Sequence, residues 1–197
     1  MKKVLLLLAN GFETYEASVF IDVIGWNLID GDGSTRLFTC GIQKEVNTTF
    51  SQKVVVDYLI EEVDVNLFDA LAIPGGFEEY NYYEDAYSEQ FVSIIRKFNA
   101  QDKTIASVCV AALPIGKSGI LKNRNATTYK VGKVRQQTLK NYGANVINEP
   151  IVTDRNVISS WNPSTAIDVA FLLLELLTSK NNTQHIREIM GFERKNT

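Results

Sequence analysis

A cysteine stands where a buried strand is predicted to turn directly into a helix. The apolar run Ile105–Val108 predicts the strand, and Cys109 follows it, ahead of the small residues Ala111 and Ala112. Open α/β proteins bind ligands at the carboxyl ends of their strands, and a strained strand-to-helix turn presents the nucleophile in hydrolases. The alternative is that Cys109 is a small core residue, because free cysteine is among the most often buried types.

Two carboxyl groups follow another predicted strand. Val4–Ala9 predicts a strand, and the loop after it carries Glu13 and Glu16. A carboxyl near the sulfur could accept or donate a proton, or hydrogen-bond an oxidised sulfur. We also expect the helix amino terminus to lower the pKa of the Cys109 thiol below its usual value of about 8.5. The alternative for both acids is that they favour the dipole of the helix that they begin.

A pair of glycines follows a third predicted strand. Ala70–Ile73 predicts that strand, and Gly75 and Gly76 come shortly after it. Together with the amide of Val110, their bare backbone N–H groups could hold an oxyanion as it develops in a transition state. The alternative is that the two glycines form a simple turn.

Composition indicates an ordinary globular α/β protein and excludes several classes. The 197 residues are 45% hydrophobic and 22% charged, and we expect one domain over residues 1–197. A net charge of −3 gives no basic surface for nucleic acid and no attraction to an anionic membrane. No apolar run reaches the roughly 18 residues of a membrane helix. The run that begins at Val4 is also too short for a signal peptide.

Cysteine and histidine usage narrows the chemistry further. The two cysteines, Cys40 and Cys109, lie far apart, so we expect no disulfide framework and a reducing, cytoplasmic location. With His185 as the one histidine, the chain has no zinc pattern, and we expect no metal. It also lacks a Walker-type loop and a G-x-G-x-x-G after a strand, so we expect no cofactor.

Alternating strand and helix patterns predict a mostly parallel sheet with helices on both faces. Further strands are predicted at Arg36–Gly41, Asn123–Thr128, Ala144–Asn148 and Val157–Ser160, with a small hairpin from Glu45–Val46 and Val54–Asp57. Helices are predicted at Tyr15–Asn27, Ala86–Ala100, Val131–Tyr142, Thr165–Thr178 and Gln184–Phe192, and we expect Glu193–Thr197 to fray.

Four short motifs resemble those of the ThiJ/PfpI superfamily, also called DJ-1/PfpI, in order and spacing from the first residue to about residue 177. They are Ala9–Glu16, Leu71–Gly76, Ala106–Cys109 and Ala126–Thr128. The resemblance implies a flavodoxin-like three-layer sandwich related to class I glutamine amidotransferases, and a homodimer. It further implies that Cys109 is the reactive cysteine of a nucleophile elbow, that Glu16 is the acid beside it, and that Gly75, Gly76 and Val110 form the oxyanion site.

The chain departs from this family pattern at its histidines. Many relatives carry a histidine where this chain has Tyr129, and amidotransferases carry theirs where this chain has Trp161–Pro163. A Cys-His pair is therefore not expected, nor is protease or glutaminase activity. We expect Tyr129 to hydrogen-bond a substrate or the sulfur, Trp161 to pack or to line the pocket mouth, and His185 to lie on the surface.

Three functions fit these residues. The first is an enzyme that acts on small electrophiles through Cys109, in the manner of glyoxalases, deglycases or isonitrile hydratases, with Glu16 as general acid and base. The second is a non-enzymatic oxidation-sensing or chaperone-like stress protein in which Cys109 becomes a sulfinate. A thiamine-related role ranks last because no phosphate-binding motif is present.

Overall fold

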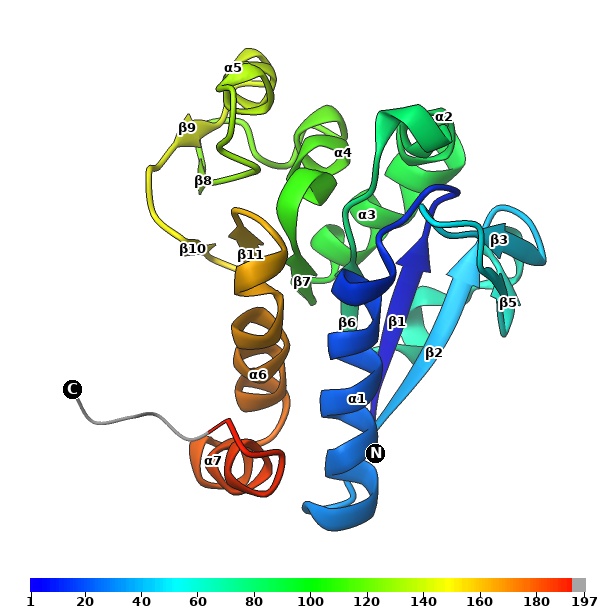
Figure 1. Ribbon diagram of the computed structural model, residues 1–197, viewed down its shortest axis with the longest axis vertical. Coiled ribbons are helices and arrows are strands. Elements are labelled where there is room, and N and C mark those ends of the chain that lie inside the picture. The colour runs from blue at the N-terminus through cyan, green and yellow to red at the C-terminus, as the bar shows by residue number, and fades with distance from the viewer. Residues whose placement is uncertain (193–197) are drawn as a thin grey trace.

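A seven-stranded sheet runs through the residues that the structure, a computed structural model, describes, namely 1–192 (Figure 1). In spatial order its strands are β10 (Ile151–Asp154), β11 (Val157–Ser160), β7 (Thr104–Ser107), β6 (Ala70–Ile73), β1 (Lys2–Leu8), β2 (Thr35–Gly41) and β5 (Tyr58–Leu59). All neighbours are parallel except β10 and β11, which are antiparallel. The predicted frayed end, Glu193–Thr197, lies outside the described residues.

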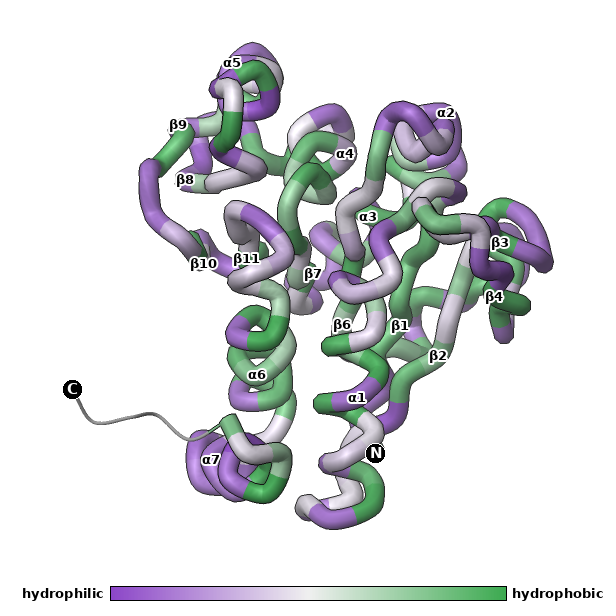
Figure 2. Tube along the Cα trace, viewed as in Figure 1, coloured by the Kyte–Doolittle hydropathy of each residue, from purple (hydrophilic) through white to green (hydrophobic). Residues whose placement is uncertain are grey.

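The central strands are the apolar runs that the sequence analysis picked out. Every residue of β6 and β11 is buried, and so are the last five of β1. Strands covered on both faces need apolar residues at consecutive positions rather than at alternate ones. Figure 2 shows these hydrophobic residues concentrated along β1 and β6, whereas the outermost helix, α7, is largely hydrophilic. The predicted mostly parallel sheet is confirmed.

Helices cover both faces of the sheet, as predicted. Figure 1 shows α1 (Thr14–Asp30) and α6 (Ala166–Leu177) side by side in front of the sheet, with α7 (Lys180–Ile189) below α6 and beside the lower part of α1. The other face carries α3 (Glu89–Ala100) and α4 (Ala112–Lys117), and α5 (Val134–Asn141) packs on α4. No helix within residues 1–192 combines the length and the apolar character that crossing a membrane requires.

The second predicted helix, Ala86–Ala100, starts three residues later than expected. Instead of one helix from Ala86, α2 (Tyr82–Ala86) ends and α3 begins afresh after Ser88. The Ser88 backbone is extended, and its hydroxyl accepts a hydrogen bond from the Phe91 N–H at 3.2 Å. A serine cap of this kind satisfies a free amide of the first turn and fixes where the helix starts.

The late strands differ most from the prediction. The two expected around residues 123–148 shrink to a separate parallel pair, β8 (Asn125–Ala126) and β9 (Asn145–Val146), and β10 was not predicted. The expected small hairpin is confirmed as the antiparallel pair β3 (Glu45–Asn47) and β4 (Lys53–Val55).

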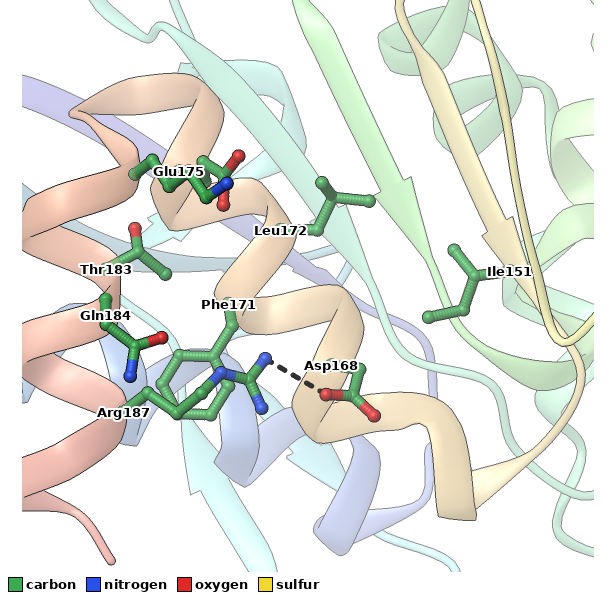
Figure 3. Close-up of a pocket in the computed structure, with 9 residues that line it drawn as sticks. Ile151, Asp168, Phe171, Leu172, Glu175, Thr183, Gln184 and Arg187 are labelled. Carbon is green, nitrogen blue, oxygen red and sulfur yellow. Dashed lines mark hydrogen bonds and ion pairs between the residues drawn. The ribbon is translucent and has the colours of Figure 1, made fainter. Parts of the chain in front are cut away.

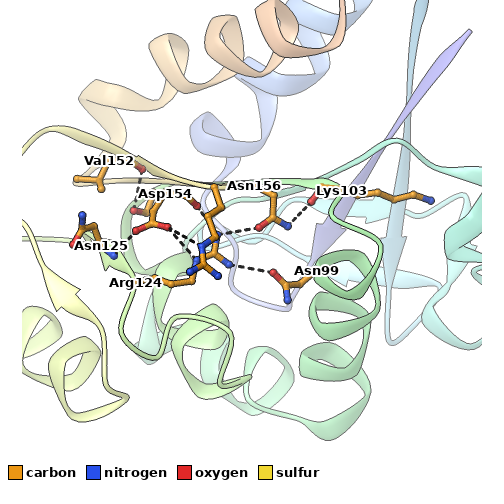
Figure 4. A network of polar contacts seen from close by, with 9 residues as sticks. Asn99, Lys103, Arg124, Asn125, Val152, Asp154 and Asn156 are labelled. Carbon is orange, nitrogen blue, oxygen red and sulfur yellow. Dashed lines mark hydrogen bonds and ion pairs between the residues drawn. The ribbon is translucent and has the colours of Figure 1, made fainter.

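A buried arginine ties the β10–β11 hairpin to the rest of the fold (Figure 4). Arg124 is 5% exposed and forms an ion pair with Asp154 at 3.4 Å. Its guanidinium also donates to the Asp154 carbonyl oxygen, to the side-chain oxygen of Asn156 at 2.9 Å and to that of Asn99 at 3.2 Å. Because a buried guanidinium is stable only when its donors are satisfied, this network fixes the position of the hairpin turn.

Candidate active site around Cys109

Cys109, Glu16 and Gly75 meet at the carboxyl edge of the sheet. Cys109 follows β7, Glu16 lies in the first turn of α1, and Gly75 follows β6. The Gly75 N–H donates to Glu16 Oε2 at 2.7 Å. A Cβ atom on Gly75 would lie 2.8 Å from that oxygen and 3.0 Å from the Cys109 Cβ. The missing side chain of Gly75 is therefore what allows the carboxyl and the cysteine to come together.

The backbone at Cys109 is held in a conformation that side-chain-bearing residues rarely adopt. Its φ is +59°, in the left-handed region. The Thr128 hydroxyl donates to the Cys109 carbonyl oxygen at 2.8 Å, and the Val108 N–H donates to the Ile73 carbonyl oxygen at 3.3 Å. Non-glycine residues with such strain cluster at active sites and ligand clamps. This turn is the strand-to-helix elbow that the sequence indicated.

Burial gives Glu16 an unusual protonation state. The side chain is fully buried, and its desolvation, followed by the charge of Glu13, raises the pKa of Glu16 from 4.5 to about 8, against the opposing effect of the Gly75 N–H. Glu16 is therefore mostly protonated at neutral pH. The side chains of Cys109 and Glu13 also act on the pKa of Glu16 through hydrogen bonding, although within residues 1–192 neither is placed well enough to be a full hydrogen-bond partner of its other oxygen, Oε1. A neutral carboxylic acid beside the cysteine is available as a proton donor.

The expected lowering of the thiol pKa is wrong. Burial, followed by the charge of Glu16, raises the pKa of Cys109 well above its ordinary value, although the Val110 N–H lowers it. The residues Cys109–Ala111 form a 3-10 turn, and the six-residue helix α4 begins only at Ala112. The sulfur is thus desolvated without the dipole of a long helix to compensate.

A cavity of about 400 Å³ opens over the cysteine. Of the residues predicted for the site, Glu13, Gly76, Cys109, Val110 and Tyr129 line it. The structure therefore brings together a thiol, a phenol, a carboxyl group and two residues whose backbone amides were expected to face an oxyanion.

Three of the predicted residues do not line the cavity, namely Glu16, which is fully buried beside the cysteine, Gly75 and Trp161. The amide of Gly75 is bonded to Glu16, so it is engaged with the acid rather than directed at a ligand. Trp161 does not line the cavity; its neighbours Asn162 and Pro163 do, and its ring packs against Lys130, whose Nζ lies 3.4 Å from the ring centroid.

The one histidine is remote from the cysteine. His185 lies in α7, at the end of the molecule opposite the elbow (Figure 1), and its Nε2 is 3.1 Å from the Asp30 carbonyl oxygen. Its side chain makes this contact at an exposed position, as the sequence analysis expected.

Sequence reasoning missed the supporting role of Tyr82. This side chain is fully buried, and its hydroxyl donates to the Pro74 carbonyl oxygen at 2.9 Å, one residue before Gly75. The signal lay in the tyrosine-rich segment after the glycine pair, but Tyr80 and Tyr83 share that composition and are not fully buried. Composition alone could not show which of the three faces inward.

A larger cavity elsewhere in the described residues has no cysteine among its lining residues. The space between α6 and α7 measures about 490 Å³ (Figure 3). Two of its four charged side chains satisfy each other, because Arg187 pairs with Asp168 at 3.0 Å, and the guanidinium carbon of Arg187 also lies 4.1 Å from the centroid of the Phe171 ring. No group of three or more His, Cys, Asp or Glu side chains within residues 1–192 could hold a metal ion.

The fold and the elbow together define a cysteine-bearing α/β protein, and comparison with known proteins identifies the family. The model of the DJ-1/PfpI family matches residues 2–176, so the chain belongs to this family. Solved structures agree in fold: Drosophila melanogaster DJ-1beta superposes with a TM-score of 0.82 at 23% identity, covering 96% of this chain and 97% of that one. A cysteine-to-alanine mutant of a DJ-1 superfamily protein from Salmonella typhimurium gives a TM-score of 0.82 at 26% identity, with 98% and 100% covered.

Curated relatives extend the comparison. The deglycase PfpI of Pyrococcus furiosus is 30% identical over 82% of this chain and 90% of its own length, and a deglycase of Thermococcus kodakarensis is 31% identical with the same coverage. Protein DJ-1 homolog A of Arabidopsis thaliana is 26% identical over 96% of this chain. The chain spans 46% of the length of that plant protein and 40% of the length of homolog B. The predicted family and flavodoxin-like fold are confirmed.

Proposed function

We propose that the protein is a cysteine-dependent enzyme that acts on small carbonyl electrophiles, with deglycase- or glyoxalase-like chemistry. The observation that carries this proposal is the geometry of the elbow: Cys109, at a φ of +59°, faces a cavity of about 400 Å³ beside the buried acid Glu16. Two relatives named as deglycases support the same class of substrate.

The first step would be addition of the thiol to the carbonyl group. The sulfur of Cys109 forms a bond to the carbonyl carbon, and the π electron pair moves to the oxygen. Glu16 donates its proton to that oxygen and takes up the proton that the thiol releases, so the addition neither consumes nor liberates protons. The backbone N–H groups of Gly76 and Val110 stabilise the negative charge on the oxygen while it develops.

This proton transfer through Glu16 is needed because the pKa of the Cys109 thiol is raised. A thiol that is desolvated in the resting protein ionises little at neutral pH, so its proton must leave as the attack proceeds. Tyr129, which lines the cavity where many relatives carry a histidine, would hydrogen-bond the substrate and would not act as the base. Without an imidazole at this position we do not propose protease or glutaminase activity.

The test is turnover of two uncharged electrophiles. Methylglyoxal would take up one water to give lactate, and an isonitrile such as cyclohexyl isonitrile would take up one water to give the formamide. We expect the wild type to form at least one of these products, Cys109→Ser to form neither, and Cys40→Ala to keep the activity, because Cys40 is a fully buried residue of β2. Absence of turnover in the wild type, or equal rates in Cys109→Ser, would overturn the proposal.

The alternative is an oxidation-sensing or chaperone-like stress protein. The observation that favours it is Glu16 Oε1, which lies buried without a hydrogen-bond partner among the described residues and could donate, when protonated, to a sulfinate at Cys109. Two peroxide molecules would convert the thiol to the sulfinic acid and release two waters. Mass spectrometry after mild peroxide tests this: two added oxygens should appear at Cys109 before Cys40, and oxidation at equal rates would contradict it.

We also propose that the protein is a homodimer whose contact includes α1. Ile21, Trp26, Leu28 and Ile29 of this helix are exposed, Ile29 at 80%. Gly25 lies among them, and no atom lies within 4 Å of where its Cβ would be, so a second helix could approach closely. Sedimentation should show a dimer that Ile29→Glu weakens, and a monomeric wild type would refute this contact.

We further propose a small-molecule substrate and a cytoplasmic location. The reaction involves a small molecule, and neither nucleic acid nor a membrane surface is proposed as a partner, because the net charge is −3. Cys40 and Cys109 are both free thiols, which fits the reducing conditions of the cytoplasm. Subcellular fractionation checks the location, and recovery of the protein from an oxidising compartment would contradict it.

A further inference from the structure

The cavity over Cys109 has an acidic lining. Glu13, Glu78 and Glu79 line it, and Arg135 is the one basic residue among its lining residues. Arg135 is already paired, because its guanidinium lies 3.0 Å from Glu78 Oε2. Among the lining residues this pair cancels one positive against one negative charge, and the carboxyls of Glu13 and Glu79 remain. Lys130, beside the site, does not line the cavity, and its ammonium lies over the Trp161 ring.

These two carboxyls have no cation of their own. Within residues 1–192 neither Glu13 nor Glu79 forms an ion pair with Lys, Arg or His. Glu79 is exposed and its carboxylate is solvated, whereas Glu13 is half-buried and burial raises its pKa. The more dependable negative charge of the cavity is therefore that of Glu79.

The acidic surface continues beyond Glu79. A second cavity of about 390 Å³ shares this residue and adds Glu84 and Asp85, with no basic residue among those that line it. Asp85 accepts hydrogen bonds from the backbone N–H and the side-chain amide of Asn10, both at 2.9 Å, which hold its carboxylate in place. Acidic residues therefore line both the cavity over Cys109 and the second cavity that shares Glu79 with it.

The walls of the site also suit a cation. Phe77 and Tyr129 are aromatic residues that line the cavity, and an ammonium group is attracted to the face of an aromatic ring. The molecule's own lysine beside the site does this already, since the Lys130 ammonium lies over the Trp161 ring. Acidic groups and aromatic faces together favour positive charge and repel a carboxylate.

We propose that the cavity over Cys109 selects electrophiles that carry a positive charge, such as a carbonyl group borne on an amine, and that Glu79 is a specificity-determining residue of this site. The inference rests on the proposed function, because it takes Cys109 as the reacting group. One unit charge several ångströms away in a solvent-filled cleft changes a local concentration by roughly threefold. Removing one carboxylate should therefore change the ratio between a cationic and an anionic probe by about tenfold at low salt, and less at high salt.

Thiol reagents of opposite charge test this without any assumption about turnover. The probes are 2-(trimethylammonium)ethyl methanethiosulfonate and 2-sulfonatoethyl methanethiosulfonate. In each reaction the Cys109 sulfur attacks the sulfenyl sulfur, a disulfide forms and methanesulfinate leaves. Mass spectrometry of the Cys109 peptide gives the two rates, and each is divided by the rate for 2-mercaptoethanol to remove the intrinsic difference between the reagents.

We expect the normalised ratio of cation to anion rates to exceed one in the wild type. Glu79→Gln should lower the ratio about tenfold, and Arg135→Gln should raise it because the Glu78 charge is then no longer cancelled. Glu188→Gln, in α7 at the opposite end of the molecule, is the matched control and should leave the ratio unchanged. Added salt should bring the wild-type ratio toward one.

The outcomes separate this inference from the proposed function. A wild-type ratio at or below one, with Cys109 labelled by both reagents, overturns the charge selection and leaves a reactive cysteine. A ratio that is the same in Glu79→Gln and in Arg135→Gln as in the wild type overturns the assignment to these residues. If neither reagent labels Cys109 faster than the fully buried Cys40, both the inference and the proposed function fail.

Discussion

Replacing Glu16 with glutamine should remove a loss of stability that the wild type suffers as the pH rises. Burial, followed by the charge of Glu13, raises the pKa of Glu16 from 4.5 to about 8 in the folded protein. Between these two values the unfolded chain releases the proton and the folded chain keeps it. The free energy of unfolding therefore falls with rising pH across this window, and this group causes no further loss above it. Glutamine stays neutral, and its side-chain oxygen can still accept from the Gly75 N–H.

The size of the effect follows from the width of the window. One pH unit corresponds to about 1.4 kcal/mol when a group is protonated in one state and ionised in the other. Across the whole window, from the ordinary pKa of 4.5 to the raised pKa of about 8, the free energy of unfolding can fall by at most about 5 kcal/mol. Between pH 6 and pH 8 the loss should be about 2 kcal/mol, because Glu16 begins to ionise in the folded protein at the upper end.

Urea unfolding of the wild type and of Glu16→Gln at pH 6, 7 and 8, followed by tryptophan fluorescence, measures the difference. We expect the advantage of the variant to grow by about 2 kcal/mol over this range, while contributions from groups common to both proteins cancel. The range stops at pH 8 because the charge of Glu16 contributes to the raised pKa of Cys109, so at higher pH the thiol would contribute differently in the two proteins. A difference that is constant with pH, or that shrinks as the pH rises, would refute the reasoning.

Three further substitutions have defined outcomes. Gly75→Ala pushes a methyl group against the Glu16 carboxyl and the Cys109 Cβ atom, so urea unfolding should show a loss of about 1–3 kcal/mol, with slower methylglyoxal turnover; an unchanged variant would contradict the tight contact. Tyr82→Phe leaves the buried Pro74 carbonyl without its donor, and a loss of about 1–3 kcal/mol should lower the thermal midpoint; an unchanged midpoint would show that this bond contributes nothing. Arg124→Met removes the cation from Asp154, so urea unfolding should show a loss of about 3 kcal/mol that Arg124→Met/Asp154→Leu partly restores; no rescue would rule out the charge explanation.

The central strands of the sheet could be predicted because each is marked by a short run of consecutive apolar residues. The runs at Val4–Ala9 and Ala70–Ile73 are apolar at consecutive positions, and such residues are buried only in strands that are covered on both faces. The edge strand β10 was not predictable in this way. It is four residues long, half of its pattern is polar, and its place depends on Arg124, which is distant in sequence.

The composition of the site was predictable, but its electrostatics were not. Cys109 follows β7 and Glu16 follows β1, the two strands on either side of β6, so both lie at one edge of a parallel sheet, and the sequence shows this. Whether the pKa of Cys109 is raised or lowered depends on how deeply the sulfur is buried and on how short the following helix is. Neither can be read from residue types. Likewise, both Gly75 and Gly76 were expected in the oxyanion site because both are glycines. In the structure, however, the Gly75 N–H donates to the Glu16 carboxyl group.

The proposed chemistry requires that reagents reach the Cys109 sulfur, although this residue is only 7% exposed. The most direct test is the rate of alkylation of each cysteine by limiting iodoacetamide at about pH 7.5, where a thiol of ordinary pKa is partly ionised, read by peptide mass spectrometry. Cys40 is the internal reference, because it is fully buried and burial raises its pKa to about 12. We predict that Cys109 is alkylated many times faster than Cys40 in the folded protein and that urea removes the difference. Equal rates in the folded protein would contradict the central claim.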